Sequence, residues 1–346
     1  MRPRKERVSV TLIVPGLCSH GAAPLVGSSL NILERVTARA DFVAARSQTV
    51  EQVLLTAFGV EYQQSVDLPV AAVTRIADVG MPDDGWWLRA DPVCLQPDRG
   101  QLVLMEGSEL DIFTEESQHL VSEIRPTLEA DCSIEAPHPY RWYLKVNPVA
   151  KIRTYELSAV ANRDIDSYLP YGEDALSWHR WLNEVQMVLH DSIVNENREA
   201  RGALPVNSLW LWGGGKLPPT PTANWSQVCS DDPVCKGLAQ LSNTSITVLP
   251  QDAHDWLEQD LMAGRYLVVF QEQSRRWNNV DGSAPSFADS FVSTWVEPLV
   301  AAIRSRRLEY VEMWDPACGR FQISRRTMRR WWRRPKSMGA FSHALE

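Results

Sequence analysis

One segment of the sequence, residues 195–218, constrains the fold more than any other. It reads NENREARGALPVNSLWLWGGGKLP, in which a polar helix end is followed by a short apolar strand and then by glycines. Glycine permits positive φ and close approach of a ligand, and α/β proteins place their sites at the carboxyl ends of strands. The segment therefore predicts an α/β fold with a candidate binding loop at Gly213, Gly214 and Gly215. Its plainer interpretation is a turn with Lys216 at the solvated exit.

Strand-like apolar runs alternate with helical patterns along the chain, which favours α/β architecture with a largely parallel sheet flanked by helices. The expected strands span residues 8–14, 101–105, 142–146, 208–212, 266–270 and 308–314. Amphipathic helices are expected over residues 178–189, 252–262 and 292–303. Gly264 should end the second helix, and Pro298 should kink the third. We expect a single α/β body over residues 1–346 and leave open an insertion in its middle third.

Composition narrows the class of protein. A chain of 346 residues that is 44% hydrophobic and 23% charged can bury a large core and is not expected to be disordered. No apolar run approaches the roughly 20 residues of a membrane span. The basic start followed by an apolar run is similar to an export signal, but Pro15 and Gly16 interrupt it, so we expect a cytoplasmic protein. The six cysteines form no C-x-x-C pair, so free thiols are expected and a zinc site is not.

The end of the chain is strongly basic. Residues 304–336 hold eleven Lys or Arg residues against three acidic residues, whereas the whole chain has a net charge of −8. Within residues 325–336, arginines alternate with Trp331 and Trp332, a pattern that suits phosphate contact and base stacking. It also suits a terminal segment docked on the body, with the tryptophans buried beneath long arginine stems. We favour docking and do not expect nucleic acid to be a partner.

Several motifs together resemble a known family. Asn195, Arg198, Gly202, Pro205, Asn207 and the ending Trp212-Gly213-x-Gly215 are similar to the N-x-x-R…G-x-x-P-x-N…G-x-G stretch of archaeal-type cofactor-independent phosphoglycerate mutases. WWLRADPVCL, PYRWYLKV, WLNEVQMVLH and SRRTMRRWWRRPK, which begin at residues 86, 139, 181 and 324, resemble RpfE-type bacterial regulatory proteins. The resemblance covers residues 8–336 and implies an alkaline-phosphatase-like fold.

The resemblance also implies a chemistry that this sequence does not support. Active relatives hold two divalent metals with Asp and His, and a Ser or Thr accepts the phosphoryl group. The first metal-binding Asp should follow the opening strand in an Asp-Gly pair, where this chain has Pro15-Gly16. The Asp-His pair expected after residues 308–314 is Asp315-Pro316, and a lone carboxylate after a strand is commonly a turn-forming residue. Where a His and an Asp-x-x-x-His arrangement are expected after residues 266–270, the chain has Gln271, Glu272, Gln273 and then Arg275-Arg276-Trp277.

We therefore expect no catalytic residue, no metal ligand and no cofactor. Ser19 and His20 could be a nucleophile and its base, but adjacent residues on a loop rarely face one another. The resulting hypothesis is a regulatory or binding pseudoenzyme of bacterial, phosphoglycerate-mutase-like type. Two alternatives remain open: an active phosphomutase with other ligands, and a nucleic-acid-binding regulator that uses the basic end.

Asn195, Arg198 and Asn207, with the glycines and Lys216, form the predicted ligand-binding set. The planar fork of Arg198 suits a carboxylate or a phosphate, so a small anionic ligand is the expected partner, with a protein partner as a further option. The alternative is that these side chains satisfy backbone groups at a helix end and serve the fold alone.

Overall fold

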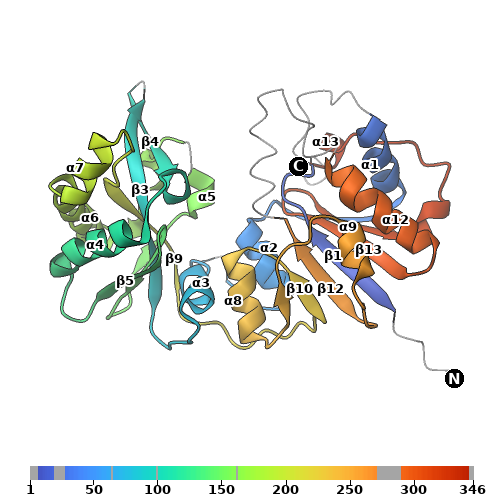
Figure 1. Cartoon of the computed structure of the whole chain (residues 1–346), viewed down its shortest axis with the longest axis horizontal. Coiled ribbons are helices and arrows are strands. Elements are labelled where there is room, and N and C mark those ends of the chain that lie inside the picture. The colour runs from blue at the N-terminus through green and yellow to red at the C-terminus, as the bar shows by residue number, and fades with distance from the viewer. Residues whose placement is uncertain are drawn as a thin grey trace. The chain divides into compact units, whose positions relative to one another are not determined.

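The structure is a computed structural model and describes residues 7–18, 28–63, 65–98, 100–160, 163–270 and 290–342 (Figure 1). The chain divides into two compact units. Unit 1 comprises Met1–Val60 and Thr220–Glu346, and unit 2 comprises Glu61–Pro219. Unit 2 thus interrupts the chain of unit 1 in its middle third, where the sequence left an insertion open. The single-body arrangement stays a prediction.

Unit 1 contains a seven-stranded, mostly parallel sheet in the order β11-β10-β12-β1-β13-β14-β2. Strand β1 lies at its centre and pairs in parallel with β12 and β13. Strand β14 pairs antiparallel with both of its neighbours, β13 and β2. The strands span Val8–Ile13 (β1), Asp41–Ala44 (β2), Gln227–Cys229 (β10), Ile246–Thr247 (β11), Arg265–Val269 (β12), Leu308–Asp315 (β13) and Gly319–Ser324 (β14). The expected mixed α/β architecture with a mostly parallel sheet is confirmed for this unit.

Helices cover the sheet of unit 1. Val10 and Leu12 of β1 pack into one apolar cluster with side chains of α1 (Ser28–Arg39), α9 (Ala253–Glu258) and α12 (Glu297–Arg304). Helices α2 (Val50–Ala57) and α8 (Pro233–Leu241) pack against each other and lie on the other side of the sheet (Figure 1). A short α13 (Gly339–Ser342) completes the described part of the unit.

Two helix expectations in unit 1 need correction. The helix expected over residues 252–262 ends at Glu258, so Gly264 does not end it and instead immediately precedes β12. The helix expected over residues 292–303 is a π-helical turn, Val292–Val296, followed by α12. Pro298 is the second residue of α12, which directly follows the π-helical turn within one continuous helical stretch, so the irregularity lies next to the residue that lacks a backbone N–H.

The sheet of unit 2 is antiparallel, so the expectation of a largely parallel sheet does not hold for the strands expected at 101–105, 142–146 and 208–212. Its order is β4-β3-β6-β5, and β9 also pairs with β3. The strands span Trp87–Asp98 (β3), Gln101–Glu106 (β4), Ser133–His138 (β5), Arg141–Lys145 (β6) and Ser208–Gly215 (β9). An antiparallel sheet has no common carboxyl edge, so the end of β9 does not have the position that a parallel α/β site requires.

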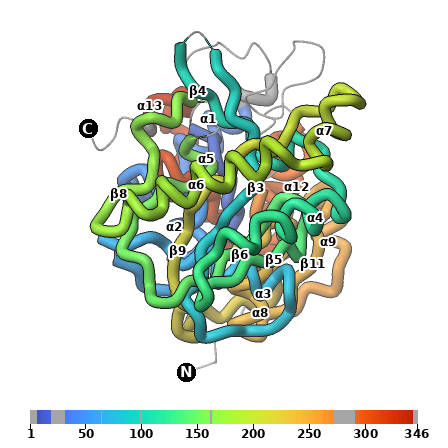
Figure 2. The backbone as a smooth tube through the Cα atoms, turned by 90° about the vertical axis from the view of Figure 1, so that its left-hand side faces the viewer, coloured from blue at the N-terminus to red at the C-terminus, as the bar shows by residue number. Residues whose placement is uncertain are grey.

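Helices lie on both faces of this sheet. Helix α3 (Val70–Val79) packs Ala71 and Ala72 against Trp87 and Tyr143. On the opposite face, α4 (Thr114–Ile124), α6 (Ala175–His190) and α7 (Ile193–Ala200) enclose a second apolar cluster, and Figure 2 looks onto this side. Between β6 and α6, the chain forms a small two-stranded ribbon of β7 (Ile152–Arg153) and β8 (Tyr171–Gly172) and a short α5 (Leu157–Val160). None of the helices in the described ranges combines the length and apolar character that a membrane crossing needs.

Candidate functional site

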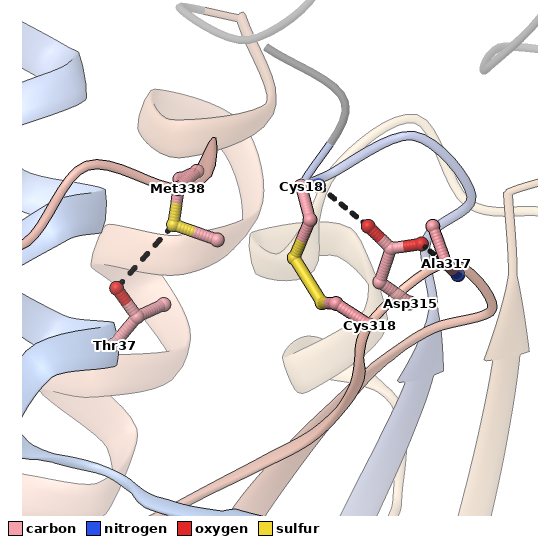
Figure 3. Close-up of a disulfide and its surroundings, with 6 residues drawn as sticks. All are labelled: Cys18, Thr37, Asp315, Ala317, Cys318 and Met338. Carbon is pink, nitrogen blue, oxygen red and sulfur yellow. Dashed lines mark hydrogen bonds between the residues drawn. A yellow bond between two sulfur atoms is a disulfide. The ribbon is translucent and has the colours of Figure 1, made fainter. Parts of the chain in front are cut away.

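The candidate site of unit 1 lies where the neighbouring parallel strands β1 and β13 end (Figure 3). Cys18 follows β1, Asp315 is the last residue of β13, and Cys318 lies in the turn between β13 and β14. Parallel strands end at one edge of a sheet, and α/β proteins place their binding sites there. The fold therefore brings these residues together, although 300 positions separate the two cysteines along the chain.

Asp315 is fully buried and ties the two strand ends together. The backbone N–H of Cys18 donates to its Oδ2 at 2.5 Å, and that of Ala317 donates to its Oδ1 at 2.8 Å. The backbone N–H of Gly16 also donates to the carboxylate. Burial raises the pKa of Asp315, and the three N–H donors offset that rise only in part. Asp315 thus forms the turn that a lone carboxylate after a strand commonly forms.

The expectation of free thiols is wrong for two of the six cysteines. Cys18 and Cys318 form a disulfide whose Cα atoms are 6.5 Å apart, within the usual range for a disulfide. Cys94, Cys132, Cys229 and Cys235 are free. Spacing along the chain cannot show that the ends of β1 and β13 are adjacent. The available signal was that each of the two cysteines closely follows an apolar strand of the kind that pairs in parallel.

One ligand atom from each of Cys18, Asp315 and Cys318 lies within 4.8 Å of the other two, and all three residues are buried. This set of atoms is suited to two kinds of chemistry. The sulfurs can undergo thiol–disulfide exchange, and in the reduced state the thiolates and the carboxylate can bind a metal ion. The sequence predicted no metal ligand, because it contains no local spacing of the kind that marks zinc sites.

Only some of the positions at which the resemblance implies metal ligands lie within the residues that the structure describes. Pro15 lies in the turn after β1, and its side chain has no ligand atom for a hard cation. Pro316 stands after Asp315 where a His is expected. The other residues considered for this chemistry lie outside the described residues: Ser19, His20, Gln271, Glu272, Gln273, Arg275, Arg276 and Trp277.

In unit 2, Asn195 has structural partners. Its Nδ2 donates to the carbonyl oxygens of Leu189 at 2.7 Å and Val206 at 2.8 Å, and its Oδ1 accepts from the Val206 backbone N–H at 2.9 Å. The side chain is buried in α7 and joins the end of α6 to the residues that lead into β9. Asn195 thereby satisfies backbone groups that would otherwise be buried without partners.

Arg198 is fully buried and uses every branch of its guanidinium within unit 2. Nη1 forms an ion pair with Glu116 of α4 at 2.6 Å, Nε donates to the Leu204 carbonyl at 2.8 Å, and Nη2 donates to the Leu110 carbonyl. The guanidinium that could bind an anionic ligand is therefore occupied by one carboxylate oxygen and two backbone carbonyls of the same chain.

Asn207 sets the position of β9 on β3. Its Nδ2 donates to the Leu95 carbonyl at 2.9 Å, and its Oδ1 accepts from the Leu95 backbone N–H at 2.7 Å. The half-buried side chain thus extends the β3–β9 ladder by one pair of hydrogen bonds just before β9 begins.

The three glycines lie inside β9, which corrects the expectation of a strand that stops at residue 212 and a free loop beyond it. Gly215 pairs with Trp87 of β3. A Cβ at Gly215 would lie 2.7 Å from the Cβ of Pro69, and one at Gly213, where φ is +67°, would lie 3.0 Å from the Cβ of Val70. The missing side chains let the start of α3 approach the strand. Lys216 follows β9 and is exposed.

The structure therefore gathers Asn195, Arg198 and Asn207 around the start of β9 and places the glycines and Lys216 at its other end. These contacts match the alternative in which the motif serves the fold. The ligand-binding role of the set stays a prediction.

Two arginines of the basic end bond to the region around the end of α1, and Met328 packs against the apolar cluster of unit 1. Arg330 forms an ion pair with Asp41 at 2.6 Å. Arg330 and Arg333 also donate to backbone carbonyls at residues 38–40, where α1 ends and its last carbonyls need donors. Trp331 and Trp332 are 78% and 64% exposed, so the expected burial of these two side chains is wrong.

Comparison with known proteins finds similarity to phosphoglycerate mutases over part of this chain. No protein-family model matches the chain. It is 30% identical over 152 residues, 43% of this chain and 38% of the relative, to a probable 2,3-bisphosphoglycerate-independent phosphoglycerate mutase from Geobacter sulfurreducens. It is 36% identical over 59 residues, 17% of this chain and 15% of the relative, to a 2,3-bisphosphoglycerate-independent phosphoglycerate mutase from Methanosarcina mazei. The matched part thus spans about two fifths or less of the length of these curated relatives.

Among solved structures, the PH0037 protein from Pyrococcus horikoshii is similar in fold, with a TM-score of 0.55 at 13% identity over 93% of this chain and 88% of that protein. A cofactor-independent phosphoglycerate mutase from Thermoplasma acidophilum aligns over 99% of this chain and 96% of that protein at 14% identity, with a TM-score of 0.45. The chain is thus a mixed α/β protein with a phosphoglycerate-mutase-like relationship over part of its sequence.

Proposed function

We propose that this chain is a regulatory or binding protein of phosphoglycerate-mutase-like type, with an alkaline-phosphatase-like unit 1, that does not carry out two-metal phosphoryl transfer. Its place among RpfE-type bacterial proteins and its cytoplasmic location belong to the same proposal. The observation that carries it is the edge of the sheet in unit 1. Where the resemblance implies metal-binding residues after β1 and β13, the chain has Pro15 and the pair Asp315-Pro316.

The chemistry of that edge supports the proposal. Two hard cations that clamp a phosphoryl group need several carboxylate and imidazole ligands around them. Pro15 and Pro316 supply none, and the carboxylate of Asp315 is held by backbone N–H groups of Cys18 and Ala317. Beside it lie two sulfur atoms, which are poor ligands for manganese and magnesium.

The test is a mutase assay on the full chain with 3-phosphoglycerate and added Mn²⁺. We expect no formation of 2-phosphoglycerate above the buffer control. Turnover that the Asp315→Asn substitution abolishes would show an active phosphomutase and would overturn the proposal. The Cys132→Ser variant is a suitable control, because Cys132 lies in unit 2 and is a free, half-buried thiol.

A small anion at the far end of β9 remains part of the proposed binding role, with Lys216 as the exposed cation of the predicted set. Arg198 does not contribute, since it is buried and already paired with Glu116. A thermal-shift screen of phosphorylated metabolites tests this site. Stabilisation that Lys216→Ala removes would support it, whereas stabilisation that survives this substitution would place the binding elsewhere.

A second candidate function is favoured by the exposure of Trp331 and Trp332 among the arginines of the basic end. Aromatic faces and guanidinium groups that point to solvent can stack on bases and contact phosphates. The test is binding of a single-stranded oligonucleotide at rising salt concentration. If the function is correct, affinity falls steeply with salt because phosphate contacts release counterions, and Trp331→Ala with Trp332→Ala weakens binding. Equal binding by the double variant would reject it.

A further inference from the structure

The cluster at the end of β1 and β13 supports an inference beyond the proposed function. We infer that Cys18, Cys318 and Asp315 bind a single soft divalent metal ion, zinc above all, when the disulfide is reduced (Figure 3). The disulfide and the metal are then alternative states of one site. This site is distinct in ligand type from a two-metal phosphotransfer centre, which uses hard oxygen and imidazole ligands.

The geometry fits a metal of zinc size. The sulfur atoms and a carboxylate oxygen already lie within 4.8 Å of one another, and they come from two adjacent strand ends of one sheet. Two thiolates on a tetrahedral zinc, with Zn–S bonds of about 2.3 Å, stand roughly 3.8 Å apart. The reduced sulfurs can reach that separation by rotation of their side chains, because the Cα atoms are 6.5 Å apart.

Asp315 has capacity left for a metal. A carboxylate offers about four lone-pair sites. Three backbone N–H groups donate to Asp315, those of Gly16, Cys18 and Ala317. Within the ranges that the structure describes, no Lys, Arg or His side chain forms an ion pair with it. A fully buried carboxylate without a cation is costly, and a divalent ion would supply the missing positive charge.

The change between the two states balances in atoms and charge. A dithiol reductant gives two electrons and two protons: the Cys18–Cys318 bond breaks to two thiols, and the reductant closes its own disulfide. The metal then displaces both thiol protons to solvent and binds the two thiolates. With Asp315 as the third ligand, the fourth position of a tetrahedral ion stays open to water or to a ligand. Catalytic zinc sites have the same arrangement of three protein ligands and one open position.

Cobalt absorption on the full chain tests the inference. The protein is reduced with a dithiol under anaerobic conditions, freed of reductant by gel filtration, and titrated with Co²⁺, and an oxidised sample is treated in parallel. We expect one equivalent to give a thiolate-to-cobalt charge-transfer band in the reduced sample and none in the oxidised one. Zn²⁺ should then remove the band, because it binds such ligands more tightly than Co²⁺.

Variants assign the ligands. We expect Cys18→Ser and Cys318→Ser each to weaken cobalt binding by more than about 100-fold, beyond the range that follows loss of an outer-shell partner. Asp315→Asn should keep the charge-transfer band but weaken binding, and Cys132→Ser should change nothing. The comparison of reduced and oxidised wild type needs no variant, so a variant that fails to fold leaves the test intact.

Three results would overturn the inference: no band in the reduced wild type, an equal band in the oxidised wild type, or a band that survives the double substitution of Cys18 and Cys318. None of them bears on the mutase assay. Conversely, turnover of 3-phosphoglycerate with Mn²⁺ would overturn the proposed function and leave the cobalt result standing.

Discussion

Arg198 in unit 2 and Asp315 in unit 1 are both fully buried charged residues, but their surroundings differ. Arg198 forms an ion pair with Glu116 and donates to two backbone carbonyls, so its hydrogen-bonding capacity is used within the chain. Among the described residues, Asp315 accepts hydrogen bonds only from backbone N–H groups, and it lies beside two sulfur atoms. Buried charges normally require a matching charge, which Arg198 has and Asp315 lacks within the described residues.

A recognisable sequence motif and a position suited to ligand binding do not coincide in this chain. The segment that includes Arg198 carries the resemblance in the sequence, yet its side chains hold α6, α7 and β9 together. The cluster around Asp315 shows no motif in the sequence, yet it lies at the sheet edge where α/β proteins bind ligands.

Arg198→Ala should lower the free energy of unfolding by about 3–5 kcal/mol, because Glu116 loses its fully buried cation and the carbonyls of Leu204 and Leu110 lose a donor. Arg201→Ala is the matched control. Arg201 pairs with the other oxygen of Glu116 at 2.8 Å, but its side chain is 40% exposed, so the loss should be below about 1 kcal/mol. Urea denaturation measures both. Equal losses for the two variants would contradict the structural role given to Arg198.

Asn195→Ala should lower the free energy of unfolding by about 2–3 kcal/mol, since the carbonyls of Leu189 and Val206 and the Val206 N–H lose a buried partner. Asn207→Ala should cost less, about 1 kcal/mol, because its side chain is half-buried and water can replace it. The same urea experiment compares the two. If Asn195→Ala changes ligand binding while stability stays at the wild-type value, the interpretation of α7 as structural is wrong.

Asp78 of α3 is a further largely buried charge of unit 2 that has partners, and its ionisation makes the stability of the unit depend on pH. Burial raises its pKa, but hydrogen bonds from Arg141 at 2.7 Å and Tyr143 at 2.6 Å outweigh burial and hold the pKa of Asp78 below 3.8. The stability from this depressed pKa is complete above pH 3.8 and is lost as the pH falls through the folded-state value.

Asp78→Asn should therefore lower the free energy of unfolding by about 1–3 kcal/mol at pH 6, and by less at pH 3. Unfolding in urea at the two pH values measures the gap between variant and wild type. A gap that widens at pH 3 would show that the charge of Asp78 does not stabilise unit 2.

Much of the fold could be predicted from the sequence, because apolar runs bounded by turn residues mark β1, β12 and β13. Which strands pair, and in which direction, was not accessible in unit 2, since an apolar run such as β9 reads the same in a parallel or an antiparallel sheet. The glycines after Trp212 suggested a loop, whereas they continue β9 where α3 packs closely. Local patterns do not record such long-range contacts.

The candidate site was predicted only in part. Pro15 and Asp315 could be examined because the resemblance fixes their places after two strands. The Cys18–Cys318 pair could not, because it depends on β1 and β13 being neighbours in the sheet. Asn195, Arg198 and Asn207 all lie around the start of β9, and their ligand-binding role stays a prediction. Residue type alone cannot distinguish a guanidinium that binds a ligand from one that binds Glu116.

Replacing both Trp331 and Trp332 by Ala should change the free energy of unfolding by less than about 0.5 kcal/mol, because both side chains are largely exposed. Trp256→Ala is the contrasting control in the same unit, since the fully buried Trp256 should cost about 3–5 kcal/mol. Thermal and urea unfolding measure the effect. A large loss for the double variant would show that the basic end docks through its tryptophans.

Native mass spectrometry of the full chain, reduced and incubated with Zn²⁺ and Mn²⁺ together, tests the contrast between the two buried charges most directly. Softer thiolate ligands favour zinc over manganese. We predict one zinc ion per chain, lost on oxidation of Cys18 and Cys318, and no retained manganese. Two manganese ions that remain bound whatever the state of the cysteines would contradict the account, because they would require a phosphotransfer centre of hard ligands.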